Sequence, residues 1–180
     1  MWCVMQVHTG MEEKIRCQCE KLIDASVLKR CFIPQFQTRK KYLGQWHTEN
    51  KILFPGYVFL VTDYPEALIE GLKRVVGMTR LLKTGEEITP LSDGEVALLL
   101  KMGGEKQEVE MSTGIIEGDL VHVYTGPLQG MEGMIKKIDR HKRMAYLEIE
   151  MFGRKVEMQA GLEIIKKIDG IIRQSGTDKE

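Results

Sequence analysis

Two rhythms of apolar and polar residues follow one another along this chain, and the change lies near Gly114. Up to Met102, short apolar runs typical of strands alternate with stretches whose apolar residues recur at helical spacing. After Gly114 only short alternating runs separated by glycine-containing turns remain, which is the pattern of a small β-barrel. The pattern therefore predicts two structural units within 180 residues.

The first unit is expected to contain strands and helices in the order strand, helix, strand, strand, helix, strand, helix. Strands are expected at 2–7, 31–36, 52–61 and 79–83, and helices at 11–25, 65–76 and 93–102. Thr9 with Glu12, and Ser92 with Glu95, have capping-box spacing. The basic stretch 39–50 is expected at the tip of a long hairpin that returns through 52–61. This order predicts an α+β fold: a ferredoxin-like α/β sandwich, with helices covering one face of an antiparallel sheet.

The remaining residues are expected to form a linker, a barrel and a tail. Residues 103–114 are acidic, contain glycine and lack apolar periodicity, so we expect a flexible acidic linker between a first domain at 1–102 and the barrel. Five short strands are expected within a barrel domain at 115–170. The polar residues 171–180 are expected to be a frayed tail.

The formal net charge is zero, but the charges are segregated along the chain. Residues 29–51 carry six basic residues against one acid, 85–119 carry nine acids against two lysines, and 136–155 carry seven basic residues against three acids. Because electrostatic fields act within about 10 Å at ordinary salt, local basic patches can bind polyanions in a neutral protein.

Composition argues against several classes of protein. No apolar run approaches the roughly 20 residues that span a bilayer, and the start of the chain lacks the pattern of a signal peptide. The four cysteines form no Cys-x-x-Cys pair, so we expect reduced thiols in a cytoplasmic protein without a metal. The scattered histidines form no catalytic constellation, and no phosphate-binding loop precedes a helix. We expect neither an enzyme nor a cofactor.

The stretch 52–61 is the most informative segment of the chain. Phe54 and Tyr57 flank Pro55-Gly56, a pair that fixes one backbone angle and permits another that most residues avoid. Such a break at a strand usually marks a bulge or an edge. The segment could therefore place aromatic side chains on a sheet edge while the apolar run that follows anchors the core.

Three motifs in order resemble the NusG family of transcription elongation factors, over nearly all of residues 1–170. Phe54-Pro55-Gly56-Tyr57-Val58 after a basic hairpin resembles the signature of the family's amino-terminal (NGN) domain. The stretch from Gly118 to Ile135, with its glycines at 126, 130 and 133, resembles a KOW motif. Met151-Phe152-Gly153-Arg154 is similar to the family's barrel segment. The resemblance implies an NGN domain joined to a small SH3-like KOW barrel.

The resemblance also implies partners and contact residues. Family members bind the clamp of RNA polymerase, here through Trp2, Val4, Phe54, Pro55, Gly56 and Tyr57. Their barrel binds ribosomal protein S10, Rho or RNA, and Met151, Phe152 and Arg154 are the candidates for a protein contact. The alternative for Trp2 and Val4, and for Phe152, is that they pack in a core. The basic hairpin and the basic run in the barrel are similar to the LoaP group, whose members recognise a hairpin in a leader RNA.

Basic residues interleaved with aromatic ones supply both phosphate contacts and stacking surfaces for RNA. The alternative for any such run is a solvated face. The candidates are Arg39, Lys40, Lys41, Trp46 and Lys51 in the hairpin, and Lys136, Lys137, Arg140, His141, Lys142 and Arg143 in the barrel. We expect a monomer that promotes antitermination by binding polymerase and leader RNA. A housekeeping factor bound to S10 or Rho, and a ribosome-associated RNA-binding protein, remain alternatives.

Overall fold

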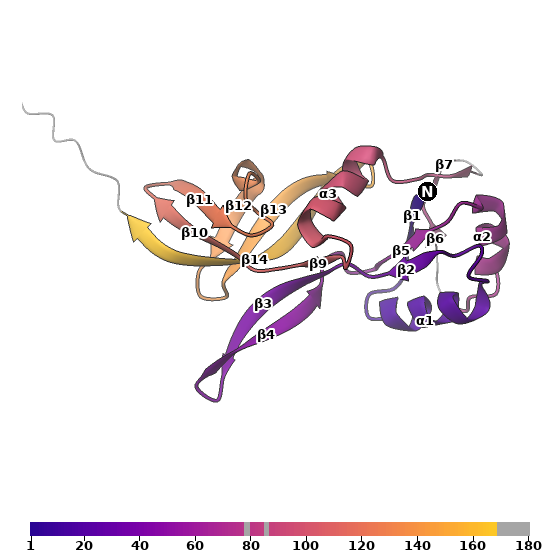
Figure 1. Cartoon of the computed structure of the whole chain (residues 1–180), viewed down its shortest axis with the longest axis horizontal. Helices are drawn as coiled ribbons and strands as arrows, with labels where there is room; N and C mark the ends of the chain where they lie inside the picture. Colours follow the sequence, from indigo (N-terminus) through magenta and orange to yellow (C-terminus); the bar gives the residue numbers. More distant parts are fainter. Residues whose placement is uncertain (78–79, 85–86, 169–180) are drawn as a thin grey trace, which may run out of the picture.

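The first part of the chain forms a four-stranded antiparallel sheet with two helices on one face (Figure 1). The computed structural model describes residues 1–77, 80–84 and 87–168. The sheet has the order β2-β5-β1-β6. Its elements are β1 (Trp2–Gln6), α1 (Glu12–Leu22), β2 (Arg30–Phe32), β5 (Tyr57–Val61), α2 (Pro65–Leu72) and β6 (Arg80–Leu81). Order and topology confirm the predicted ferredoxin-like α+β fold.

Alternation along the central strands divides this domain into two apolar layers. Cys3 and Met5 of β1, with Val58 and Leu60 of β5, lie in the core beneath α1 and α2. The intervening side chains face the opposite side of the sheet, as the period of two requires. That side carries aromatic residues, which would be open to solvent if nothing covered them: Trp2, Phe32, Tyr57 and Phe59.

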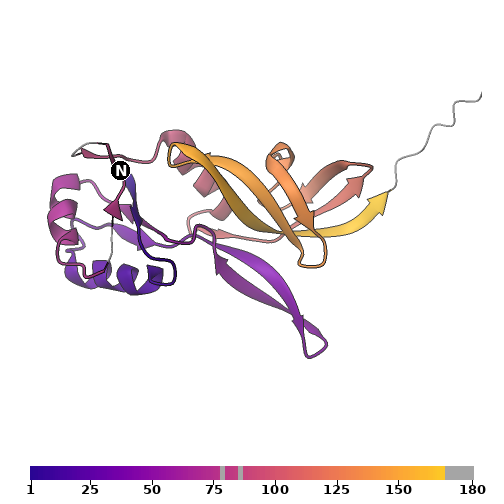
Figure 2. The ribbon, with the colours of Figure 1, turned by 180° about the vertical axis from the view of Figure 1, so that it is seen from behind.

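A long two-stranded hairpin is inserted between β2 and β5 and extends away from the sheet (Figures 1 and 2). It consists of β3 (Gln35–Tyr42) and β4 (Gln45–Ile52). The prediction of a long hairpin is confirmed, but its second arm is β4 alone. The bend at Leu53–Gly56 separates β4 from β5, and Gly56, directly before β5, has a φ of +83° that is not compatible with an extended strand.

Short elements and one more helix complete the first part of the chain. The strands β7 (Lys83–Thr84) and β8 (Glu87–Ile88) pair with each other and precede α3 (Asp93–Gly103). The predicted capping box is present at the start of α3: the Ser92 side chain accepts from the Glu95 amide, and Glu95 accepts from Ser92.

The segment 103–114, expected to be a flexible linker, contains paired strands. Its strand β9 (Glu108–Val109) lies parallel to β3, and the first residues of β10 (Ser112–Glu117) join the barrel sheet. Gln107, Val109 and Ser112 are buried. The glycines of this segment suggested a mobile linker. In the structure its strands instead pair with β3 of the first domain and with the barrel sheet. The domain boundaries themselves stay a prediction, and the expected tail at 171–180 lies outside the described residues.

The barrel is a five-stranded sheet with the order β11-β10-β14-β13-β12. Its further elements are β11 (Leu120–Thr125), the 3-10 turn η1 (Glu132–Met134), β12 (Ile135–Asp139), β13 (Met144–Met151) and β14 (Arg154–Ile168). The strand expected at 155–158 is thus the start of the longest strand in the described chain, and it pairs with both β13 and β10. None of the described helices is long and apolar enough to cross a membrane.

Candidate functional site

The barrel covers the aromatic face of the ferredoxin-like sheet through a single turn. Phe152, in the turn between β13 and β14, stacks on Tyr57 with ring centroids 4.6 Å apart. It also meets Phe54 edge-on at 5.7 Å. Together with Phe59 these residues form what we call the aromatic contact, which is continuous with the apolar cores of both domains. Aromatic pairs at such distances are stabilising beyond the area that they bury.

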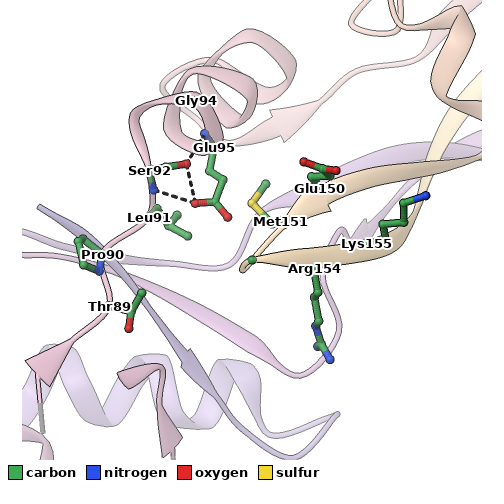
Figure 3. A pocket seen from close by; sticks show the side chains of 11 residues that line it. Thr89, Pro90, Leu91, Ser92, Gly94, Glu95, Glu150, Met151, Arg154 and Lys155 are labelled. Atoms are coloured by element: carbon green, nitrogen blue, oxygen red, sulfur yellow. Dashed lines mark hydrogen bonds between the residues drawn. The ribbon is translucent and has the colours of Figure 1, made fainter. Parts of the chain in front are cut away.

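Polar groups hold the same turn in place. The Phe152 amide donates to Glu95 Oε1 at 2.5 Å, so the glutamate that caps α3 also binds the barrel. The Arg154 guanidinium donates to the Tyr57 hydroxyl. Figure 3 shows the groove beside this contact, about 810 Å³ in volume, between the start of α3 and the barrel turn, with Arg154 and Lys155 pointing to different sides of the strand.

The residues predicted to bind polymerase are therefore mostly covered. Phe54 is 2% exposed and Tyr57 9% exposed, and Val4 and Gly56 are also buried. Trp2 is half-buried, and only Pro55 of this set is exposed. Their predicted binding role stays a prediction, but in this arrangement polymerase could not reach Phe54 or Tyr57.

The residues predicted to bind a second protein lie on the other side of the same contact. Met151 is fully buried inside the barrel, whereas Phe152 and Arg154 project from it. Phe152 faces Phe54 and Tyr57, and Arg154 bonds to Tyr57. The two predicted protein-binding surfaces thus cover each other.

The turn that carries Phe152 is strained in a way that favours a functional explanation. Met151 and Arg154 are paired, leaving the two-residue loop Phe152-Gly153 with φ values of +58° and +68°. This is the geometry of a type I′ turn, whose first position favours asparagine rather than a bulky side chain. A non-glycine residue held there costs on the order of 1–3 kcal/mol. The contact with Tyr57 and Phe54 offsets that cost.

The buried carboxylate of Glu12 holds the Phe54–Tyr57 bend in place through hydrogen bonds. Glu12 is 1% exposed, and its two oxygens accept from the amides of Gly56 at 2.7 Å and Gly10 at 2.6 Å. The expected capping box with Thr9 is wrong, because α1 begins after Met11 without a side-chain cap and the Glu12 carboxylate is used on the bend instead. Glu12 therefore positions the candidate polymerase-binding segment.

A second contact joins the domains at the hairpin. Glu163 of β14 forms ion pairs with Arg39 of β3 at 3.1 Å and with Arg143, in the β12–β13 turn, at 3.0 Å. The Arg143 guanidinium lies over the Trp46 ring, 3.6 Å from its centroid. We call these four residues the basic contact. The structure thus brings together the hairpin and barrel segments that were predicted separately to bind RNA.

Strand alternation sorts the basic hairpin residues onto two faces. Arg39, Lys41 and Trp46 lie on the face that meets the barrel, as the pairing of Lys41 with Trp46 requires. Lys40 and Lys51 lie on the other face, where Tyr42 stacks on His47 at 3.6 Å between ring centroids. These two lysines are therefore not part of the basic contact.

The predicted basic residues of the barrel are also divided. Arg140, His141 and Lys142 are exposed in the β12–β13 turn, beside Arg143. Lys136 and Lys137 lie on β12, where Lys136 pairs with Glu148 at 4.0 Å and Lys137 approaches the Tyr146 ring. Of the turn residues, Arg143 contacts the hairpin, at Trp46.

Close backbone packing fixes the hairpin against the barrel. A side-chain carbon on Gly161 of β14 would collide with the Gln37 carbonyl oxygen and the Met111 side chain. Within the hairpin's own sheet, Gln37 and Asn50 donate to Glu108 of β9 and thereby lower the pKa of that carboxyl. The half of the hairpin nearer the sheet is thus held in place, which positions Arg39 for the basic contact.

Gly161→Ala is expected to separate the hairpin from the barrel and to lower the thermal midpoint by several degrees. The added carbon meets backbone, which cannot move aside as the end of a flexible side chain could. Gly133→Ala, in the same barrel but with open space around it, is the matched control and should unfold within about 1 °C of the parent. Equal midpoints for the two variants in a thermal melt would contradict this packing.

Sequence reasoning missed several residues that organise these surfaces. Glu12 and Glu95 were expected only as helix caps and Glu163 was not singled out, and no local pattern reveals their partners at Gly56, Phe152 and Arg39. Leu43, at the hairpin tip, is 94% exposed with a φ of +50° in a type I′ turn. The pair Leu43-Gly44 occupies a place where Asn-Gly is usual, so an exposed leucine in this turn is unusual.

Side chains that could hold a metal ion do not gather in the described part of the chain. Within residues 1–77, 80–84 and 87–168, no three His, Cys, Asp or Glu side chains are placed to hold a metal ion. Burial raises the pKa of the Cys3 thiol to about 11, which makes it unreactive at neutral pH.

Comparisons with known proteins agree with this geometry. The family model described as transcription termination factor NusG matches residues 1–100. The transcription termination/antitermination protein NusG of Bacillus subtilis is 26% identical, over 93% of this chain and 98% of its own length. That of Borreliella burgdorferi is 24% identical over the same shares.

A solved structure shares the fold. The chain described as "Domain interaction in Thermotoga maritima NusG" is 23% identical, with a TM-score of 0.58, and the match covers 89% of this chain and 92% of that one. The family model matches more than half of the 180 residues, and the curated relatives match almost the whole chain. This chain belongs to the NusG family of transcription termination and antitermination factors.

Proposed function

We propose that this chain promotes processive antitermination, by binding the clamp of RNA polymerase through its first domain and a hairpin in the leader RNA through its basic surfaces. The single observation that carries the proposal is the basic contact. It places the turn Arg140–Arg143 of the barrel beside the basic hairpin, so that two segments distant in sequence present cations and an aromatic ring together. This arrangement supports membership of the LoaP group.

The polymerase-binding surface in this proposal is the aromatic face around Phe54 and Tyr57. Because Phe152 covers both residues, the aromatic contact must open before they can reach the clamp. The solved structure of the NusG protein of Thermotoga maritima is also described as showing a domain interaction. A similar interaction here makes polymerase binding conditional on separation of the domains at this end.

Once both surfaces are occupied, the chain acts as a tether. Binding of the clamp keeps it closed and disfavours pausing, and RNA bound to the same protein stays at a high effective concentration beside the polymerase. Neither step requires a cofactor or covalent chemistry.

A second candidate is a housekeeping factor whose barrel binds ribosomal protein S10 or Rho. The projection of Phe152 and Arg154 from the β13–β14 turn favours it, since both would be free for a protein partner after the aromatic contact opens. A ribosome-associated RNA-binding protein is the third candidate and would co-purify with ribosomes rather than with polymerase.

Arg140→Ala combined with Lys142→Ala is expected to weaken binding to a structured leader RNA by about tenfold or more. Both side chains are exposed in the β12–β13 turn and neither takes part in the basic contact. The slope of log K against log salt should fall by about 1.5, because two phosphate contacts are lost. A gel-shift series at several salt concentrations measures both effects.

The matched control is Lys14→Ala combined with Lys21→Ala, which removes two exposed lysines from α1. It should leave RNA affinity and salt slope unchanged, and both double variants should bind polymerase as the parent does. If the two double variants bind leader RNA equally well, the turn is a solvated face. If the parent binds no structured RNA but binds S10 or Rho, the housekeeping function replaces the proposal.

A further inference from the structure

We infer that the β3–β4 hairpin and the β12–β13 turn form one composite RNA-binding site, which exists only while the two domains are packed together and whose halves are joined by Glu163. The inference rests on the proposed binding of RNA and goes beyond it. It states that neither domain alone carries the complete site, and that domain packing regulates RNA affinity.

Contacts across the domain boundary are the first support. Glu163 receives one arginine from each domain on its two oxygens, Arg39 on Oε2 and Arg143 on Oε1. An ionised carboxylate between two guanidinium groups fixes their spacing, because each hydrogen bond is charge-assisted. Glu163 is thus a positioning residue for cations from both domains.

Basic side chains outnumber acidic ones around the β12–β13 turn, so this region carries a net positive charge. An open groove of about 550 Å³ lies beside the β12–β13 turn, and its lining includes Lys137, Arg140, His141 and Arg143. Across the basic contact, Arg39 and Lys41 belong to the facing side of the hairpin. Only Asp139 and Glu163 oppose these cations within the groove lining. A phosphate backbone that follows the groove onto the hairpin would neutralise groups of both domains.

An aromatic ring at the boundary supplies a stacking surface. Trp46 is 42% exposed although the Arg143 guanidinium lies over one face. Indole and guanidinium planes are the surfaces on which unpaired bases stack. The boundary between the domains therefore suits an RNA with a structured backbone and at least one unpaired base.

Backbone strain is the fourth support. Arg143 has a φ of +53°, and Phe152 has a φ of +58° at the other end of β13. Both are non-glycine residues in left-handed conformation, and each contacts the first domain. Strain of this kind is found where the surroundings impose it and often marks a functional site. Both barrel turns thus hold a left-handed residue against the first domain.

Strand β13 connects the aromatic contact at one of its ends to the basic contact at the other. β13 has eight residues, so its ends lie about 23 Å apart at roughly 3.3 Å per residue. Because β13 belongs to a single sheet, opening of the aromatic contact at one end also shifts the turn at the other. By reciprocity, RNA bound at the basic contact must stabilise the aromatic contact to the same extent.

Two alanine variants of β14 test the role of Glu163. Glu163→Ala and Glu157→Ala both remove one negative charge from this strand, but Glu157 has no ion pair among the described residues. If charge alone governed affinity, both variants would bind leader RNA slightly more tightly. The composite site predicts at least about a tenfold loss for Glu163→Ala, an intermediate loss for Glu163→Gln and no loss for Glu157→Ala. Equal or tighter binding by Glu163→Ala would overturn the inference.

Phe152→Asn tests the need for domain packing without touching a basic residue. Asparagine suits the type I′ turn, so the barrel should fold at least as well, while the aromatic contact is lost. RNA affinity is expected to fall at least about tenfold. In the parent, RNA should slow hydrogen exchange of the Phe152 amide, which lies at the far end of β13. Unchanged affinity in Phe152→Asn would show that one domain suffices.

The proposed function fails differently from this inference. If the parent binds no structured RNA, both fall. If the parent binds RNA, and Arg140→Ala with Lys142→Ala weakens binding while Glu163→Ala and Phe152→Asn do not, the function stands and the composite site is refuted.

Discussion

The Phe152→Asn variant is expected to bind RNA polymerase at least about tenfold more tightly than the parent chain. Phe152 contacts Tyr57, Phe54 and Phe59. Each aromatic pair contributes about 0.5–1.5 kcal/mol beyond area burial, and about 1.4 kcal/mol corresponds to a factor of ten. Loss of the ring makes the open arrangement more frequent and exposes Phe54 and Tyr57 to the clamp, without any change on the first domain itself.

Biolayer interferometry with purified core polymerase measures this effect, and Leu43→Asn is its matched control. Leu43 occupies the same position in a second type I′ turn, at the hairpin tip, with a φ of +50°. Both variants relieve backbone strain, but only Phe152→Asn removes a contact between the domains. Leu43→Asn should therefore bind polymerase as the parent does.

The direction of change separates this prediction from simple damage. A misfolded variant would lose affinity for both polymerase and RNA, whereas Phe152→Asn should gain affinity for polymerase and lose it for RNA. If polymerase affinity stays unchanged in Phe152→Asn, the aromatic contact does not control access to Phe54 and Tyr57.

Elements that depend on local pattern were predictable from the sequence. The apolar alternation of β1 and β5, the helical spacing of α1 and α2, and the Ser92–Glu95 capping box all reappear in the structure. Each of these signals resides within a few residues, so a single sequence suffices to read it. The ferredoxin-like order then follows from the order of the elements.

The packing of the two domains was not predictable, because its contacts join residues that are far apart in sequence. Arg154 and Tyr57 are 97 positions apart, and Arg39 and Glu163 are 124 positions apart. Nothing in the sequence near Glu163 distinguishes it from Glu157, which has no such partner among the described residues. The acidic segment 103–114 was misleading for the same reason, since β9 is ordered by its pairing with β3.

Some properties of the candidate binding residues could be predicted from local sequence, and others depend on residues far away in the chain. Arg140 and Lys142 were predicted from a run of charge and are exposed, as the run suggested. Phe54 and Tyr57 were predicted from a short motif to bind polymerase, which stays a prediction, and both rings lie on the aromatic face of the sheet. The motif could not show that the surface is covered, because the covering residue, Phe152, belongs to a domain that begins many residues later.

Glu12→Gln is expected to destabilise the first domain by about 2 kcal/mol, and Glu12→Ala by more. The Glu12 carboxylate is buried and accepts from two backbone amides, those of Gly56 and Gly10. Hydrogen bonds to charged groups are worth about 1.5–3 kcal/mol each, and an unsatisfied buried donor is costly. Glutamine keeps one acceptor oxygen, so one of the two amides would face its NH₂ group, which only donates.

Thermal unfolding measures this loss, and the neighbouring residue provides the control. A change of about 2 kcal/mol lowers the midpoint by about 4–8 °C in a chain of this size. Glu13→Gln makes the same substitution one position away, where the carboxylate is exposed and pairs with Arg16 at 2.5 Å. Exposed pairs contribute about 1 kcal/mol at most, so its midpoint should stay close to that of the parent. Similar midpoints for the two variants would mean that Glu12 does not hold the bend.

Polymerase binding extends the Glu12 prediction from stability to function. Gly56 immediately follows Phe54-Pro55 and precedes Tyr57, so release of its amide frees the bend that presents both aromatic rings. At a temperature where Glu12→Gln is still folded, its affinity for core polymerase should fall, even in the Phe152→Asn background, where the rings are uncovered. An unchanged affinity in that double variant would mean that Phe54 is held by its own packing against Phe59 rather than by the buried carboxylate.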